Sequence, residues 1–143
     1  MTYRHRRVVR FGECDPAGAV YFPVFFDWFH QAMEAWFEDA LGLSYADVVQ
    51  RTGLPAAHTK ADFKSVIRFG DVVFVELRVA RLGGRSLTLR FSVVDDAGQL
   101  RATGETVCVA IPREPDGGFA FSAAAIPDDL RARIEAFGVE PSD

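Results

Sequence analysis

Residues 23–42 read PVFFDWFHQAMEAWFEDALG, and this stretch decides the fold. Pro23 suits the first position of a helix because its missing N–H would have no partner there, and Gly42 stands where a left-handed C-terminal cap is expected. We therefore predict one long helix from about Pro23 to Leu41. At intervals of 100° its polar residues form one narrow stripe, and the apolar arc is too wide for a helix on the outside of a bundle. We expect something curved to wrap around this helix.

The rest of the chain supplies strands on both sides of the helix. Residues of about 3–11 predict a first strand, which ends at the turn-rich residues 14–18. Ser44 followed by Asp47 resembles a helix N-cap and predicts a short helix to about Thr52. From His58 onwards apolar residues recur at every second position. Tight turns divide this region into four strands of a predicted antiparallel meander, at about 59–69, 72–82, 85–94 and 100–111. An amphipathic segment at 128–137 predicts a last helix on the surface.

The order of these elements predicts an α+β fold, with the long helix held against one face of a curled sheet. No repeat and no linker interrupts residues 1–143, so we expect a single domain, which the length of the chain also suits. One helix cannot cover both faces of a sheet. The opposite face or an exposed edge strand then needs a partner, and we expect a homodimer.

Composition excludes several classes of function. The formal net charge of −4, with basic residues scattered between acids, argues against a nucleic-acid partner. No apolar run approaches the ~20 residues that span a bilayer, and the N-terminus lacks the apolar core of a signal peptide, so we expect no membrane partner and a cytoplasmic location. The two cysteines, Cys14 and Cys108, lie far apart in sequence, which gives no support to a disulfide framework or a zinc site.

The segment before the helix carries the candidate chemistry. Residues 11–23 read FGECDPAGAVYFP. Pro16 keeps the backbone of Asp15 extended, and Gly18 allows the sharp reversal that follows. The loop leads into the start of the long helix, whose first N–H groups have no intrahelical partner and carry a partial positive charge. A carboxylate beside such donors is suited to acyl transfer. The alternative is that Asp15 only makes an Asx-type turn.

Taken whole, residues 11–23 followed by Trp28 resemble the hotdog-fold 4-hydroxybenzoyl-CoA thioesterases, whose pattern is close to FGDCDPAGIVWFP. The resemblance covers most of the chain, including the helix exit at 42–43, the turn at 69–71 and the strand start at 85–86. It implies a hotdog fold, in which a curved antiparallel sheet wraps a long central helix. It also implies an acyl-CoA thioesterase that acts on an aromatic substrate such as 4-hydroxybenzoyl-CoA or benzoyl-CoA. No cofactor is expected, because CoA is part of the substrate, and no metal is expected.

By this resemblance Asp15 matches the catalytic carboxylate, as nucleophile or general base, and Phe22 matches the residue whose backbone N–H points at the thioester oxygen. The resemblance places the site between two subunits of a homodimer or homotetramer, so we expect Lys60 or Arg85 of one chain to serve Asp15 of another. Arg85 and Ser86 match the stretch that meets the nucleotide end of CoA, although Arg85 alternatively is only an exposed hairpin residue. The expected substrate-binding residues are Gly18, Tyr21, Phe25, Trp28, His30, Thr59, Lys60, Arg85 and Ser86.

The sequence departs from the family at His30, where the hydroxybenzoyl enzymes carry Asp. A neutral imidazole accepts or donates a hydrogen bond, so the substrate can differ from hydroxybenzoyl-CoA. Alternatively His30 is only a boundary residue of the helix. A rigid aromatic slot of Tyr21, Phe25 and Trp28 favours an aryl or short acyl group over a long chain.

Three further alternatives remain open from the sequence. One is a short-chain aliphatic thioesterase, although those enzymes usually carry His where this chain has Phe22. Another is a non-hydrolytic acyl-CoA-binding or dehydratase-like hotdog domain, for which the catalytic His signature is absent. The third makes Cys14 the nucleophile, but no His or Asn partner can be assigned to it, and a small buried residue is the other interpretation.

Overall fold

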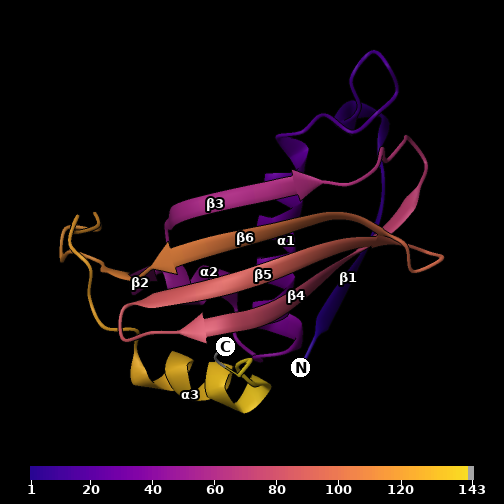
Figure 1. The fold of residues 1–143 in the computed structure, drawn as a ribbon. Coiled ribbons are helices and arrows are strands. Elements are labelled where there is room, and N and C mark those ends of the chain that lie inside the picture. The colour runs from indigo at the N-terminus through magenta and orange to yellow at the C-terminus, as the bar shows by residue number, and fades with distance from the viewer. Residues whose placement is uncertain (142–143) are drawn as a thin grey trace.

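The computed structural model describes residues 1–141 (Figure 1). The long helix and the last helix form where the apolar periodicity predicts them. The long helix, α1, has 16 residues and is shorter at both ends than predicted. Gly42 adopts a positive φ of 67° just beyond α1, as predicted for a left-handed cap. The elements are β1 (Tyr3–Val8), the 3-10 turn η1 (Phe11–Glu13), α1 (Val24–Asp39), α2 (Tyr45–Val49), β2 (Thr52–Gly53), β3 (Ala56–Phe63), β4 (Val72–Leu82), β5 (Ser86–Asp95), β6 (Leu100–Val109), β7 (Ile111–Pro112) and α3 (Asp128–Phe137).

The main sheet has five antiparallel strands in the order β1-β4-β5-β6-β3. The predicted meander is correct for β4, β5 and β6 but wrong for β3, which pairs with β6 at the far edge instead of with β4. The predicted strand at 59–69 also ends early, at Phe63. Its second half leaves the sheet because Ile67 accepts a hydrogen bond from the Val20 N–H and Arg68 pairs with Ala19. Residues 64–71 thus support the loop that carries Asp15.

Helix α1 lies across one face of this sheet, with α2 beside it, and α3 packs against β4 (Figure 1). The wide apolar arc of α1 is buried, and Trp28, Phe29, Trp36 and Phe37 are at most 1% exposed. Phe29 stacks on Phe91 of β5, with ring centroids 4.6 Å apart. The α+β arrangement expected from the sequence is therefore present, with a curved sheet packed on a largely buried helix.

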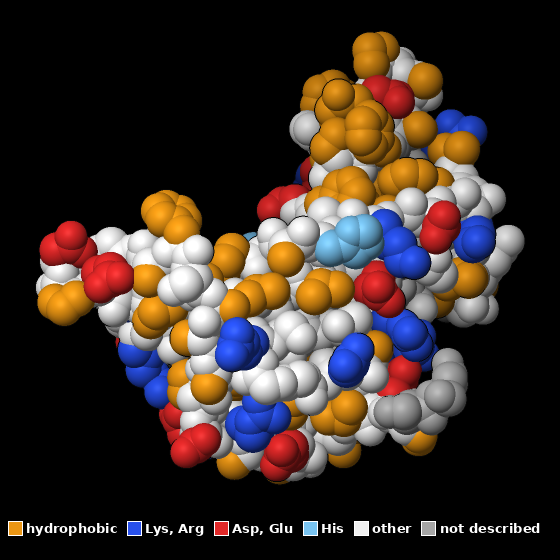
Figure 2. Space-filling view, turned by 60° about the vertical axis from the view of Figure 1, so that its left-hand side comes forward, with side chains coloured by type: hydrophobic (Ala, Val, Ile, Leu, Met, Phe, Trp, Pro, Cys, Tyr) orange, Lys and Arg blue, Asp and Glu red, His pale blue; other side chains and the backbone are white. Residues whose placement is uncertain are grey.

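The strand β3 forms one edge of the sheet, and seven of its eight residues are exposed. Figure 2 shows a hollow on this side of the molecule between two projections, the hydrophobic 11–22 segment at the top and the 113–121 segment at the left. Exposed aromatic residues cluster on the upper projection: Phe11, Tyr21, Phe22 and Phe69. Within residues 1–141, no helix combines the length and the apolar character that crossing a membrane requires.

Candidate active site

The loop between η1 and α1 is a tight, internally bonded turn that holds Asp15. Its N–H donates to the Ala19 carbonyl at 2.8 Å, and its carbonyl accepts from the Gly18 N–H at 2.9 Å. Gly18 has a φ of 83°, so it supplies the reversal predicted for it. The Asp15 side chain also makes the contacts of an Asx-type turn, because Oδ1 accepts from the N–H groups of Ala17 (2.9 Å) and Ala19 (3.2 Å). The other oxygen, Oδ2, accepts no hydrogen bond within residues 1–141, so the half-buried carboxylate keeps one free oxygen.

The start of α1 differs from the expectation that its first N–H groups lack partners. The N–H groups of Val24, Phe25 and Phe26 donate to the carbonyls of residues 21, 22 and 23 at 2.9, 3.2 and 3.1 Å. Three-residue turns of this kind tighten a helix end and satisfy its donors. The N–H of Phe22 donates to no acceptor within residues 1–141, whereas the Tyr21 N–H on its other side donates to the Glu13 carbonyl. Phe22 therefore carries a free N–H donor at the end of the loop that holds Asp15.

A small cavity of about 320 Å³ opens beside this donor. Phe22 and Phe25 form its helix side, and Phe63 closes it with its ring centroid 5.0 Å from that of Phe25. The residues that border it are Ala19, Val20, Phe22, Phe25, Phe63, Lys64, Ser65, Val66 and Ile67. The cavity thus joins the Asp15 loop, the start of α1 and the end of β3.

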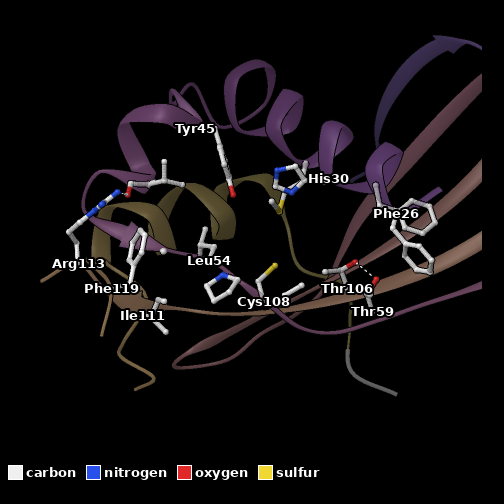
Figure 3. Close-up of a pocket in the computed structure, with 16 residues that line it drawn as sticks. Phe26, His30, Tyr45, Leu54, Thr59, Thr106, Cys108, Ile111, Arg113 and Phe119 are labelled. Atoms are coloured by element: carbon white, nitrogen blue, oxygen red, sulfur yellow. Dashed lines mark hydrogen bonds between the residues drawn. The ribbon is translucent and has the colours of Figure 1, made fainter. Parts of the chain in front are cut away.

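A larger cavity of about 510 Å³ lies between α1, α2 and the β3–β6 side of the sheet (Figure 3). Its walls are largely apolar, from residues such as Phe29, Met33 and Leu54. In Figure 3 the hydroxyl of Tyr45 and the sulfur of Cys108 point into the space. Burial raises the pKa of Tyr45 to about 12, so the phenol stays neutral and can donate a hydrogen bond in ordinary buffers.

His30 lies on the helix wall of this larger cavity. Its Nε2 is 3.3 Å from the Glu34 carboxylate one turn further along α1, and its ring meets that of Tyr45 edge-on at 5.7 Å. At the end of the cavity, the hydroxyl of Thr59 lies 3.1 Å from that of Thr106 (Figure 3). His30 and Thr59 were both expected to bind substrate, and the structure brings them to one cavity.

Other predicted site residues line neither of these two cavities within one chain. Trp28 is fully buried and lines neither cavity, because its indole N–H points to Glu13. Tyr21 is 53% exposed and packs edge-on against Phe22. The Asp15 loop packs on residues 67–68, just before β4 begins. Arg85 and Ser86 lie just after the other end of β4. The 11 residues of β4 separate these two residues from the loop by about 30 Å. Lys60 is exposed on β3 opposite Glu105.

Sequence patterns missed most of the larger cavity, because its walls come from α1, α2, β3, β6 and the chain after β7. Arg113 is an example without any sequence signal. Its guanidinium donates to the carbonyls of Val49 (2.7 Å), Gln50 (3.1 Å) and Gly117, and it stacks over Phe119 at 4.2 Å. It thereby caps the C-terminus of α2 and closes one end of the cavity.

Comparisons with known proteins agree on one family. The profile described as "Thioesterase-like superfamily" matches residues 9–134. The 1,4-dihydroxy-2-naphthoyl-CoA hydrolase of Prochlorococcus marinus (strain MIT 9313) is 39% identical over 95 residues, which are 60% of this chain and 62% of that protein. The match therefore spans less than two thirds of that relative. The hydrolase of the same name from Synechocystis sp. is 30% identical over 115 residues, 78% of this chain and 83% of that protein.

Solved structures share the whole fold. The dynemicin thioesterase superposes with a TM-score of 0.85 at 26% identity, over 99% of this chain and 100% of that chain. A 1,4-dihydroxy-2-naphthoyl-CoA thioesterase from Synechocystis gives 0.81 at 26% identity, over 94% and 96% of the two chains. A 4-hydroxybenzoyl-CoA thioesterase in complex with 4-hydroxybenzoyl-CoA gives 0.80 at 23% identity, over 93% and 98%, and at that identity the likeness concerns the fold alone.

Proposed function

The chain belongs to the thioesterase-like superfamily and has its hotdog fold, and from this premise we propose that it is an acyl-CoA thioesterase that hydrolyses an aromatic acyl-CoA to the free acid and CoA. One observation carries the proposal. The Asp15 carboxylate keeps a free oxygen, and Phe22, whose N–H is free, borders an apolar cavity at the end of the same short loop. Its relatives named as thioester hydrolases support the same reaction class.

Each part of this arrangement has a role in hydrolysis. The N–H of Phe22 donates a hydrogen bond to the thioester carbonyl oxygen and stabilises the negative charge that develops there. On one route the Asp15 carboxylate attacks the carbonyl carbon and expels the CoA thiolate, and a water then hydrolyses the anhydride to the free acid and restores Asp15. On the other route the carboxylate removes a proton from a water that attacks the carbonyl carbon and expels the CoA thiolate directly. The hydrogen bonds from Ala17 and Ala19 hold Oδ1 and leave Oδ2 for the reaction. In this mechanism the Asx-type turn holds the catalytic carboxylate in place, so it is compatible with a catalytic role of Asp15.

The proposed substrate carries an acyl group of one or two aromatic rings. The 510 Å³ cavity has the size and apolar walls of a small-molecule site. Benzoyl-CoA and 4-hydroxybenzoyl-CoA carry a single ring, and the relatives are named for the two-ring 1,4-dihydroxy-2-naphthoyl group. His30 and Tyr45 provide polar groups for ring substituents.

In a homodimer, Asp15 of one subunit can lie next to the larger cavity of the other subunit. The exposed edge of β3 offers unpaired N–H and C=O groups to a second copy. In an antiparallel pairing about a two-fold axis, the Phe63 end of one β3 meets the Ala56 end of the other. The Asp15 loop of one subunit, which lies at the Phe63 end, would then face the half of the partner's β3 that begins at Ala56 and includes Thr59, both of which border the larger cavity. This arrangement supports a site between subunits.

The test is a panel of CoA esters with detection of the released thiol. We expect hydrolysis of benzoyl-CoA, 4-hydroxybenzoyl-CoA or 1,4-dihydroxy-2-naphthoyl-CoA to exceed that of butyryl-CoA. Asp15→Asn should keep the fold and lower kcat by roughly 10³-fold or more, the scale of loss when a central catalytic group is removed. Asp96→Asn, an exposed turn residue, is the matched control and should act like wild type. Full activity of Asp15→Asn would overturn the mechanism.

Two outcomes of the same panel would favour the alternatives. Preference for butyryl-CoA would indicate a short-chain aliphatic thioesterase, and tight binding of CoA esters with no thiol release would indicate a non-hydrolytic binding domain. A single turnover in ¹⁸O-labelled water, combined with rapid quenching and mass analysis of the protein, separates the two roles of Asp15. A quenched chain heavier by the acyl group, or label in the Asp15 carboxyl, indicates an anhydride. Label only in the product acid, with no acylated chain at any quench time, indicates a directed water.

A further inference from the structure

Glu13, two residues before Asp15, has both carboxylate oxygens occupied by donors. Oε1 accepts from the backbone N–H of Arg10 at 2.8 Å. Oε2 accepts from the indole N–H of Trp28 at 2.7 Å and from the guanidinium of Arg7 at 2.9 Å. The Glu13 side chain is only 16% exposed. Charge-assisted hydrogen bonds of this length are among the stronger ones in proteins, so the carboxylate has a defined position.

The donors around Glu13 come from rigid parts of the fold. Trp28 lies on α1 and is 0% exposed, so the packed core fixes its indole. Arg7 lies on β1, its side chain is 15% exposed, and it also donates to Gln31 on α1. The guanidinium carbon lies 5.4 Å from the Trp28 ring centroid. Through Glu13, the active-site loop is tied to both β1 and α1.

The main chain of Glu13 extends the same anchor to the other side of the loop. Its carbonyl accepts the Tyr21 N–H at 2.9 Å, and the next residues along, Cys14 and Val20, pair as an antiparallel bridge. Asp15 follows Cys14 directly, and Phe22 follows Tyr21 directly. Both proposed catalytic groups therefore lie within two residues of contacts made at Glu13.

The electrostatics of the site keep Glu13 charged. Desolvation raises the pKa of this carboxyl, but the hydrogen bonds from Trp28, Arg10 and Arg7, with the Arg7 charge, together outweigh it, so the pKa lies below its ordinary value. The side chain therefore acts as an acceptor only, and it matches the three donors that surround it.

We propose that Glu13 is a positioning residue that fixes the Asp15 carboxylate relative to the Phe22 N–H, an inference that rests on the proposed function of these two groups. Glu13 lines neither cavity, so it acts on the reaction through the loop and not through contact with substrate. A group that only orients catalytic atoms changes kcat more than it changes KM.

The substitution Glu13→Gln is a sharp test because it preserves shape. A glutamine has one acceptor oxygen and one NH₂ group, and both positions here face donors. In either amide orientation, one N–H is placed against another N–H. The loop should therefore lose its anchor without loss of side-chain volume.

Kinetics with 4-hydroxybenzoyl-CoA and 1,4-dihydroxy-2-naphthoyl-CoA test the inference. We expect Glu13→Gln to lower kcat by about 100-fold, the scale of loss for a small misplacement of catalytic groups, with KM changed less than about 3-fold. Glu135→Gln on α3 removes the same charge at an exposed position far from the loop and should match wild type. In an Asp15→Asn background, Glu13→Gln should cause little further loss, since Glu13 acts through Asp15. Wild-type kcat in Glu13→Gln, or a full further loss in the Asp15→Asn background, would overturn the inference.

Two measurements keep this test independent of the proposed function and of folding. Hydrogen exchange in residues 14–22 should be faster in Glu13→Gln and unchanged in Glu135→Gln, whether or not a CoA ester is cleaved. Unchanged exchange would refute the anchor. Should Glu13→Gln not fold, Trp28→Phe removes one donor and keeps a ring in the core, and we expect about a tenfold lower kcat with KM retained. Wild-type kcat in Trp28→Phe would then count against the inference. Full activity of Asp15→Asn would refute the proposed mechanism and the positioning role that rests on it, whereas the exchange measurement would still test the anchor itself.

Discussion

Gly104 of β6 lies directly against the aromatic ring of Phe29 on α1, so that a Cβ at position 104 would overlap the ring. Phe29 also stacks on Phe91, the β5 residue that pairs with Gly104, at 4.6 Å with an interplanar angle of 11°. Glycine weakens the interior of a strand, and its presence here marks a close approach of helix and sheet. This contact sets the separation between α1 and the strands around the larger cavity.

We predict that Gly104→Ala destabilises the protein by about 1–3 kcal/mol, because the added methyl group forces the ring or the helix to move in a packed core. Urea unfolding followed by circular dichroism measures the change. Gly84→Ala is the matched control, since a Cβ there meets nothing within 4 Å, and it should unfold like wild type. Equal stability of the two variants would show that the core yields at this contact.

The two cysteines should differ in reactivity. Cys108 is 2% exposed, and burial raises its thiol pKa to about 11, so only about 10⁻³ of it is thiolate at pH 8. Cys14 is partly exposed on the loop that carries Asp15. We predict that Ellman's reagent titrates one thiol per native chain at pH 8 and two after denaturation, and that Cys14→Ser abolishes the native reaction. Two thiols that react equally fast in the native protein would contradict this.

The same raised pKa has a consequence for stability. Above the ordinary thiol pKa, Cys108 loses its proton in the unfolded state before it does so in the folded state. The unfolded state then binds fewer protons, so the free energy of unfolding falls as pH rises toward 11. Cys108→Ala should reduce this slope in urea unfolding measured between pH 8 and 10, and a slope equal to that of wild type would contradict the prediction.

Most of the fold could be predicted from local sequence signals, and the errors have physical causes. The apolar periodicity and flanking residues located α1 and α3, and Gly and Asp turns separated β4, β5 and β6. The alternating pattern of residues 59–69 gives the faces of a strand but not its neighbour, so the edge position of β3 could not be read from it. It also could not show that residues 67–68 leave the sheet to support the Asp15 loop.

The candidate site was predictable only where it is local in sequence. The turn at Asp15, Pro16 and Gly18 is encoded within a few residues, so its geometry followed from them. Glu13 stood in the same motif without an assigned role, because its partners Trp28 and Arg7 become neighbours only in the folded chain. The larger cavity is assembled from three separate stretches of the chain, 26–33, 45–59 and 106–119, which no short pattern describes.

Tyr45 should contribute to recognition of substituted rings, given the proposed function. Its neutral hydroxyl points into the larger cavity (Figure 3) and donates to no acceptor within residues 1–141. We predict that Tyr45→Phe lowers kcat/KM for 1,4-dihydroxy-2-naphthoyl-CoA by about 3- to 10-fold, the value of one hydrogen bond. Activity on 2-naphthoyl-CoA, which lacks the hydroxyl groups, should be unchanged. An equal loss on both esters would assign Tyr45 to packing alone.

The proposed site between subunits can be tested by mixing inactive variants. Asp15→Asn removes the carboxylate, and the double variant Lys60→Ala/Arg85→Ala removes the two cations proposed to serve the partner's Asp15. In a hybrid dimer, one site then carries both defects and the other carries none.

Random reassociation of equal amounts after mild denaturation should restore about a quarter of wild-type thiol release, because half of the dimers are hybrid and each has one intact site. Neither variant alone should recover under the same treatment. If the mixture stays as inactive as its components while native mass spectrometry shows hybrid dimers, then the cations and the carboxylate of each site come from one chain. Since about 30 Å of β4 separate Arg85 from the Asp15 loop within a chain, that result would also remove Arg85 from the site.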